Sequence, residues 1–184
     1  MASAEIPVRR APGGARWRAS LWDYAAIVGW LAGLTVLGFL VRSVSGPALV
    51  SPSPPLGAVD AAALLLTVFP VWLYFTIGEG GRAGAGWGKR RARLRVVDAG
   101  GGRASYGRVA VRNAVKLLPW QLAHLAVARL ILAVDAPVTV GVTYTLALVI
   151  PLVSIVMAWR DPLRRALHDR AAGTRVVQAP GAES

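Results

Sequence analysis

The chain has 184 residues, 55% hydrophobic and only 16% charged, which is well below the roughly 25% charged residues of soluble proteins. Its 21 Lys and Arg against 9 Asp and Glu give a formal charge of +12, and it has no cysteine. Apolar segments of about 20 residues argue against a soluble nucleic-acid-binding protein, and the lack of cysteine excludes disulfides and Cys-ligated metals. We therefore expect one integral membrane domain, with its positive charge against anionic lipid headgroups.

The N-terminal part of the chain predicts a tail, a first membrane span and an exposed loop. Residues 1–15 are polar and basic and are expected to be disordered. Residues 21–41 form an apolar run long enough to cross roughly 30 Å of hydrocarbon. Arg42 can snorkel at its far end, and four prolines within residues 43–58 indicate a loop.

Three further spans are predicted at residues 59–77, 115–134 and 138–159. The third begins as an amphipathic helix near Tyr106, and Asp135-Ala136-Pro137 is typical of a tight outer turn. Asp161 can cap a short basic interfacial helix over residues 163–172. We expect the membrane domain to comprise residues 16–177 and residues 178–184 to be a disordered tail.

The distribution of positive charge predicts the orientation. The N-terminal tail holds four Lys and Arg, residues 82–116 hold ten, and the tail from Arg160 holds five, so 19 of the 21 lie on one side. Only Arg42 and Arg129 fall near the other side. Because basic segments stay in the cytoplasm, we expect a multi-pass protein of the cytoplasmic membrane with both termini inside.

Two short β-rich segments predict a cytoplasmic cap. Leu94 to Asp98 enters a glycine-rich turn that lets Arg103 to Ser105 fold back, and Thr174 to Val177 follows Gly173, which is suited to cap a helix. Since a lone strand leaves its amides and carbonyls unpaired, we expect the two segments to form one small sheet. This sheet would clamp the second, third and fourth spans together. Asp169 beneath it would neutralise one of three cations, Lys89, Arg90 or Arg95.

The predicted fold class is therefore an all-α membrane protein, a four-transmembrane-helix bundle with a small cytoplasmic β-hairpin or strand cap. Three stretches also resemble the RDD family of small prokaryotic membrane proteins, which is named for an arginine and two aspartates. The first holds Arg16 and Asp23, the second runs from Gly88-Lys89-Arg90 to Arg112-Asn113, and the third is 167–177. Gly86 departs from the threonine that the family often carries.

The resemblance implies motif positions at Arg16, Asp23, Lys89, Asp98, Arg112, His168 and Asp169. The family's second aspartate is either Asp169 or Asp98. The resemblance also implies a hypothesis of transport, which has been suggested to be sodium–proton exchange for some members.

The residues themselves favour two sites. Arg16 and Asp23 lie seven residues apart, which is two helical turns, so we predict an ion pair within roughly 4 Å, with Arg164 and Arg165 as the alternative partners of Asp23. A carboxylate in a span is a functional candidate by default, and a structural ion pair is the alternative.

The second candidate is His124, which lies on one face of the third span and could shuttle protons, or could simply hydrogen-bond to a neighbouring helix. Pro70, Pro119 and Pro151 would each free the carbonyl four residues earlier, for ion binding or for a packing kink. Gly29 and Gly33 would permit close contact within the bundle or in a dimer.

No metal-ligand cluster and no nucleophile–base pair can be identified, so we expect no enzyme, no metal and no cofactor. Two functional hypotheses remain. The first is transport of cations or protons by Asp23, His124 and Asp169 along a continuous hydrated path, with a homo-oligomer expected because four spans make a small transporter. The second is a non-transporting scaffold or accessory protein whose basic cap binds anionic lipid or a partner protein, with both aspartates in a closed ion-pair network.

Overall fold

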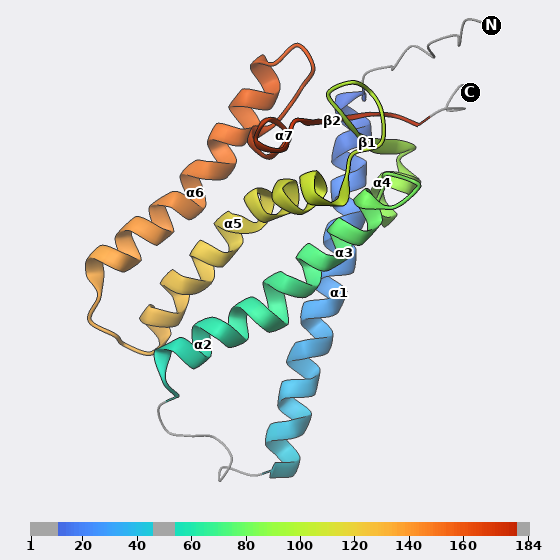
Figure 1. The fold of residues 1–184 in the computed structure, drawn as a ribbon. Helices are drawn as coiled ribbons and strands as arrows, with labels where there is room; N and C mark the ends of the chain where they lie inside the picture. The colour runs from blue at the N-terminus through green and yellow to red at the C-terminus, as the bar shows by residue number, and fades with distance from the viewer. Residues whose placement is uncertain (1–10, 46–53, 180–184) are drawn as a thin grey trace, which may run out of the picture.

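The computed structural model describes residues 11–45 and 54–179, which are mostly helical (Figure 1). The helices are α1 (Gly13–Ser45), α2 (Leu56–Ala63), the π-helix η2 (Leu64–Val68), α3 (Phe69–Gly80), α4 (Trp87–Arg91), α5 (Tyr106–Ile131), α6 (Pro137–Arg160) and α7 (Leu167–Ala172). The strands are β1 (Leu94–Asp98) and β2 (Thr174–Gln178). α2, η2 and α3 follow one another as a single rod, and α5 and α6 run antiparallel beside each other.

Three helical segments of the described chain are long and apolar enough to cross a membrane: Gly13–Val44, Leu56–Gly80 and Pro137–Arg160. The fourth predicted span, 115–134, falls mostly within α5, which ends at Ile131 and is less apolar than the three segments above. The physical reason is that four polar side chains interrupt the apolar run, namely Lys116, Gln121, His124 and Arg129. A count of four spans is therefore not confirmed.

The predicted strand pairing is confirmed. β1 pairs with β2 in antiparallel register, with Val96 opposite Val176 and Asp98 opposite Thr174. Arg103 folds back to make a single bridge with Val97, so the expected hairpin partner is one residue pair long. Gly173 ends α7 in the left-handed conformation, with φ of 62°.

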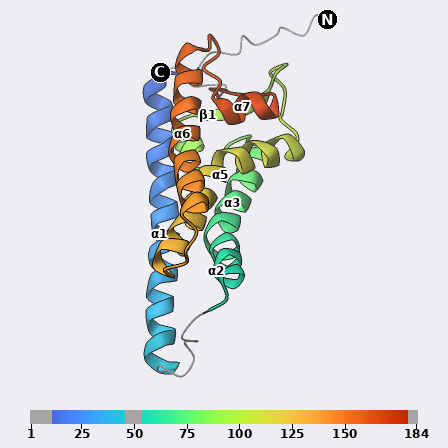
Figure 2. The same ribbon diagram turned by 90° about the vertical axis from the view of Figure 1, so that its left-hand side faces the viewer.

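The sheet also packs on the first span, which was not predicted. Residues 81–105 and 161–179 hold α4, α7 and the sheet at one end of the bundle (Figure 2). We call them the cap. β1 contacts α1, β2 contacts α5, and α7 contacts α5 and α6. The second span is held too, since Arg103, which bridges to β1, donates to the Gly80 carbonyl at the end of α3 at 2.7 Å.

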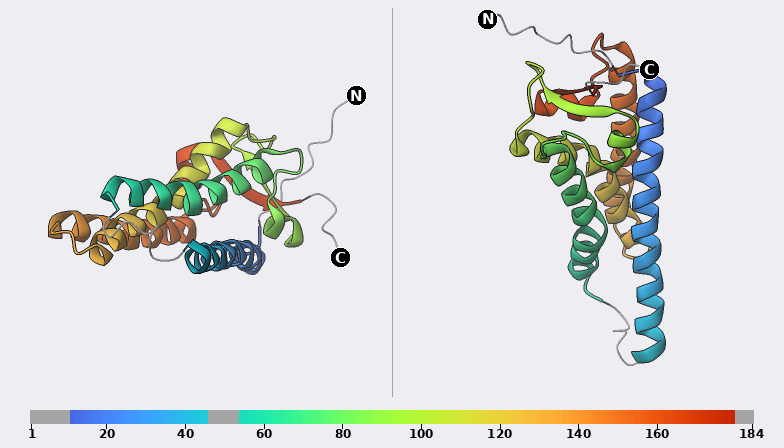
Figure 3. Two further views of the ribbon diagram at one scale, coloured as in Figure 1. Left: turned by 90° about the horizontal axis from the view of Figure 1, so that it is seen from below. Right: turned by 90° about the vertical axis from the view of Figure 1, so that its right-hand side faces the viewer.

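Small side chains explain how α1 reaches the sheet. Ala15 and Ala19 lie one turn apart on α1, and together with Ala11, which precedes the helix, they are buried with Leu94, Val96 and Val176. Helix α1 begins at Gly13, inside the stretch predicted to be disordered; residues 1–10 lie outside the described ranges. Farther along, α1 is largely exposed and stands to one side of the other helices (Figure 3).

The interfacial helix predicted over residues 163–172 is shorter than expected. Asp161 closes a turn instead of starting the helix, because its Oδ1 accepts the Leu163 amide at 2.6 Å. Its Oδ2 accepts hydrogen bonds from Arg165 at 3.0 Å and from Arg170 at 2.9 Å. The helix therefore begins only at Leu167.

Candidate functional site

Glu79 is the centre of a buried group of ionic side chains next to the cap. It lies in the last turn of α3 and has no exposed surface. The Lys89 Nζ donates to its Oε1 at 2.7 Å, and the Arg112 Nη1 donates to its Oε2. A carboxylate in the interior is costly unless it is paired and hydrogen-bonded, and here both oxygens have a cation.

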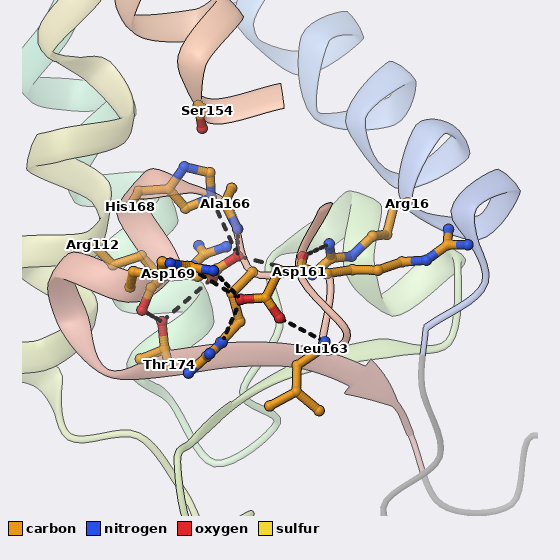
Figure 4. Close-up of polar contacts among 12 residues, drawn as sticks. Arg16, Arg112, Ser154, Asp161, Leu163, Ala166, His168, Asp169 and Thr174 are labelled. Carbon is orange, nitrogen blue, oxygen red and sulfur yellow. Dashed lines mark hydrogen bonds and ion pairs between the residues drawn. The ribbon is translucent and has the colours of Figure 1, made fainter. Parts of the chain in front are cut away.

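The guanidinium of Arg112, which contacts Glu79, also contacts Asp169 at the start of α7 (Figure 4). Arg112 Nε donates to Asp169 Oδ1 at 2.9 Å, and the Ala166 amide donates to Oδ2 at 3.2 Å. Arg16 Nη2 lies 3.9 Å from Oδ2, and the Thr174 hydroxyl lies 3.4 Å from Oδ1. Asp169 thus caps its own helix while joining α1, α5 and β2.

Asp23, on α1, is held by α3 and α4. Its Oδ1 accepts the Gly88 amide at 2.9 Å and the Tyr74 hydroxyl at 3.2 Å, and its Oδ2 lies 3.9 Å from Lys89 Nζ. A Cβ at Gly88 would lie 2.2 Å from the Ala19 carbonyl oxygen, so only glycine lets α4 approach α1 this closely.

These side chains form what we call the ion-pair network, whose members are Asp23, Glu79, Asp169, Arg16, Lys89 and Arg112. Three carboxylates match three cations, so its formal charge is zero. Burial raises the pKa of Asp169, but the charges of Arg112 and Arg16 outweigh it and hold that pKa below its usual value.

His168 adjoins the network without completing it. Its Nε2 lies 3.7 Å from Asp169 Oδ2. Burial, followed by the nearby Arg112, lowers the pKa of His168 to about 3. The imidazole is therefore neutral at physiological pH, and the charges of the network balance without it.

The sequence-predicted candidates divide into two groups. Six of them are brought together: Arg16, Asp23, Lys89, Arg112, His168 and Asp169. Their predicted pairing was wrong. Asp23 meets Lys89 instead of Arg16, Arg164 or Arg165, and Asp169 meets Arg112 instead of Lys89, Arg90 or Arg95. The reason is the cap: α4 inserts against Asp23, while α7 lies against Arg112 and Arg16.

Asp98 and His124 lie apart from the network. Asp98 Oδ1 accepts the Gly102 amide at 2.9 Å, which stabilises the turn after β1. His124 uses both ring nitrogens on neighbours, with Nδ1 2.9 Å from the Trp120 carbonyl oxygen and Nε2 3.3 Å from the Thr67 hydroxyl. This geometry matches the interpretation that His124 hydrogen-bonds to a neighbouring helix.

One of the carbonyls expected to be freed by proline has a protein partner. Trp30 Nε1 donates to the Leu66 carbonyl at 3.0 Å, four residues before Pro70. This bond links α1 to the π-helix, so this carbonyl serves helix packing. Gly29 and Gly33 have nothing within 4 Å of an added Cβ, so neither forms a close contact within the described chain.

Sequence reasoning missed two charged residues, Glu79 and Lys116. Glu79 follows an apolar span directly and stands between two glycines, and a carboxylate in that position is a functional candidate. Lys116 was counted only among the ten basic residues of 82–116. It lies one helical turn after Arg112, with its Nζ 3.5 Å from the centroid of the Phe75 ring.

The fold and the network together define a small helical membrane protein with an interlocked polar cap. Residues 10–173 match the RDD family, so the chain belongs to that family. No curated protein and no solved structure matches the chain.

Proposed function

We propose that this RDD-family protein is a non-transporting membrane scaffold whose basic cap docks on anionic lipid headgroups. In this proposal four helices, including α5, span the cytoplasmic membrane and the cap faces the cytoplasm. The charge distribution supports this orientation, since 19 of 21 Lys and Arg belong to the N-terminal tail, residues 82–116 and the tail from Arg160.

The observation that carries the proposal is the closure of the ion-pair network. Asp23, Glu79 and Asp169 have side chains at most 6% exposed, and each has a cation within 4 Å. An ion carrier needs carboxylates that release and rebind their cation, whereas here the cations belong to the chain itself. The ring nitrogens of His124 contact the Thr67 hydroxyl and the Trp120 carbonyl oxygen and not a member of the network, which also argues against one continuous path.

The cap surface has the chemistry of a headgroup contact. The guanidinium of Arg91 lies 4.5 Å from the centroid of the Trp22 ring and 4.9 Å from that of Trp87. A hollow of about 820 Å³ next to it is bordered by Arg18, Arg91 and Arg93. Tryptophan prefers the membrane interface and arginine binds phosphate, so this surface would lie at the headgroup level.

Thermal unfolding in lipid nanodiscs tests the docking. We expect anionic lipid to raise the midpoint relative to neutral lipid, with the gain falling as salt is added, because each Lys or Arg near an anionic surface contributes about 1 kcal/mol. Arg91→Gln should lose part of that gain. Equal midpoints in both lipids would contradict docking.

Ion flux in reconstituted vesicles tests the other half of the proposal. We expect the wild-type protein and Asp23→Asn to give the same flux as empty vesicles. A flux that the wild type supports and Asp23→Asn abolishes would establish transport and overturn the scaffold proposal.

A further inference from the structure

A cavity of about 300 Å³ lies between α1, α3, α5 and α6. Its lining includes Ser20 and Asp23 of α1, Phe75 of α3, Lys116 and Trp120 of α5, and Pro151 of α6. The size is at the lower end of small-molecule sites, which are typically about 300–1,000 Å³. The cavity is distinct from the hollow on the cap surface, with which it shares no lining residue.

Among the described residues that line this cavity, Lys116 is the charged one with no oppositely charged group within 4 Å. Within the described ranges no carboxylate lies within 4 Å of its ammonium group, and its ring contact is with Phe75 at 3.5 Å. The three carboxylates of the network already face Arg16, Lys89 and Arg112. A half-buried ammonium without an anion is costly, so an anionic ligand would stabilise it.

Asp23 also lines the cavity, and its charge has to be accounted for. Its Oδ1 already accepts two hydrogen bonds, and Lys89 lies 3.9 Å from its Oδ2. The remaining acceptor capacity of Asp23 suits a hydroxyl donor better than a second cation. The cavity thus offers a cation for a phosphate at Lys116 and an acceptor for a hydroxyl at Asp23.

The surroundings of the cavity favour a lipid over a water-borne anion. Ile27, Leu117 and Pro119 supply much of its remaining lining. Helix α1 makes its main contacts with α4 and β1, and α6 packs mainly on α5, so α1 and α6 flank the cavity without being main partners of each other. The neighbouring surfaces are apolar, with Tyr24 64% exposed and Leu152 62% exposed. A headgroup could therefore enter sideways from the bilayer.

We propose that this cavity binds one anionic phospholipid with a hydroxyl-bearing headgroup, its phosphate at Lys116 and its hydroxyl at Asp23. The site is independent of the cap surface.

Native mass spectrometry of the purified full-length protein, titrated with phosphatidylglycerol after delipidation, tests the proposal. We expect one tightly held lipid, at least tenfold weaker binding in Lys116→Met, and retained binding in Lys116→Arg. Arg91→Gln on the cap is the matched control and should keep this lipid. Loss of the lipid in Arg91→Gln with full retention in Lys116→Met would overturn the cavity site and leave the cap proposal standing.

Two further arms decide between ligands and guard against misfolding. Inorganic phosphate should bind far more weakly than phosphatidylglycerol; equal or tighter binding of phosphate at Lys116 would overturn the lipid proposal.

If Lys116→Met fails to fold, bromine-labelled phosphatidylglycerol provides a test with the lysine in place. It should quench the wild type more than Trp120→Phe, because Trp120 lines the cavity. Equal quenching of the two proteins would contradict the site.

Discussion

The cap end of the molecule and its far end are held together in different ways. At the cap end, Glu79 of α3, Arg112 of α5 and Asp169 of α7 are at most 2% exposed, and Arg112 pairs with both carboxylates. Toward the far end α6 has no buried residue, and α1 exposes large apolar side chains such as Phe39 and Leu40. The far end depends on lipid to cover it, whereas protein groups specify the cap. The fold is therefore fixed chiefly where the polar network lies.

The strongest test of this difference removes the shared cation. Arg112→Met keeps much of the side-chain volume but removes the cation that Glu79 and Asp169 share. We expect a loss of about 3–5 kcal/mol of unfolding free energy, since breaking a buried pair strands an uncompensated charge. Denaturant unfolding in one detergent measures it.

Arg108→Met is the matched control, because Arg108 lies one turn earlier on α5, is exposed, and makes one hydrogen bond of 3.4 Å to the Gly173 carbonyl. We expect a change within about 0.5 kcal/mol. If both variants lost the same stability, the network would not be what holds the cap.

The lowered pKa of His168, which lies in the cap, predicts that the stability of the folded protein depends on pH. Its pKa is about 3 in the folded protein against 6.5 ordinarily, so between these values the unfolded chain binds a proton that the folded chain does not. Stability therefore falls as pH falls below about 6.5, by up to about 1.4 kcal/mol per pH unit. The lowered pKa of Asp169 acts only at lower pH, as that group becomes protonated.

We expect His168→Gln to lose this part of the dependence. From pH 6.5 to 5 the wild type should lose about 2 kcal/mol more than the variant, as measured by unfolding midpoints at each pH. Parallel curves for the two proteins would show that His168 titrates normally.

The cap was largely predictable from the sequence, because local rules decide it. Arg-Val-Val occurs at residues 95–97 and again at 175–177, shortly after Gly173. This pattern indicated two short strands, each of which would leave its amides and carbonyls unpaired without the other. The pairing of β1 with β2 follows from that need. Membership of the RDD family was likewise visible in the motifs around Asp23, Lys89 and Asp169.

The partners within the network were not predictable in the same way. Helical spacing placed Arg16 and Asp23 on one face, but tertiary packing decided which helix each one meets. Gly88 lets α4 come close enough to α1 to supply Lys89, and this depends on three-dimensional approach. Glu79 escaped notice because it ends an apolar span, where a lone acid is commonly taken as a boundary.

Breaking an ion pair at the far end is expected to give the smallest change in the free energy of unfolding. Arg129 of α5 and Asp60 of α2 form a two-pronged ion pair there, with both N–O distances 3.1 Å and side chains 14% and 22% exposed. Asp60→Asn should cost less than about 1 kcal/mol, because partly exposed pairs contribute little. Arg129 also keeps its bond to the Leu125 carbonyl at 2.8 Å and can extend toward the interface.

The double variant Asp60→Asn with Arg129→Gln completes a thermodynamic cycle, in the same unfolding assay used for Arg112→Met. A coupling energy of 3 kcal/mol or more, which is the lower bound for the buried pairs of the cap, would mean that ions hold both ends alike and that the two regions do not differ.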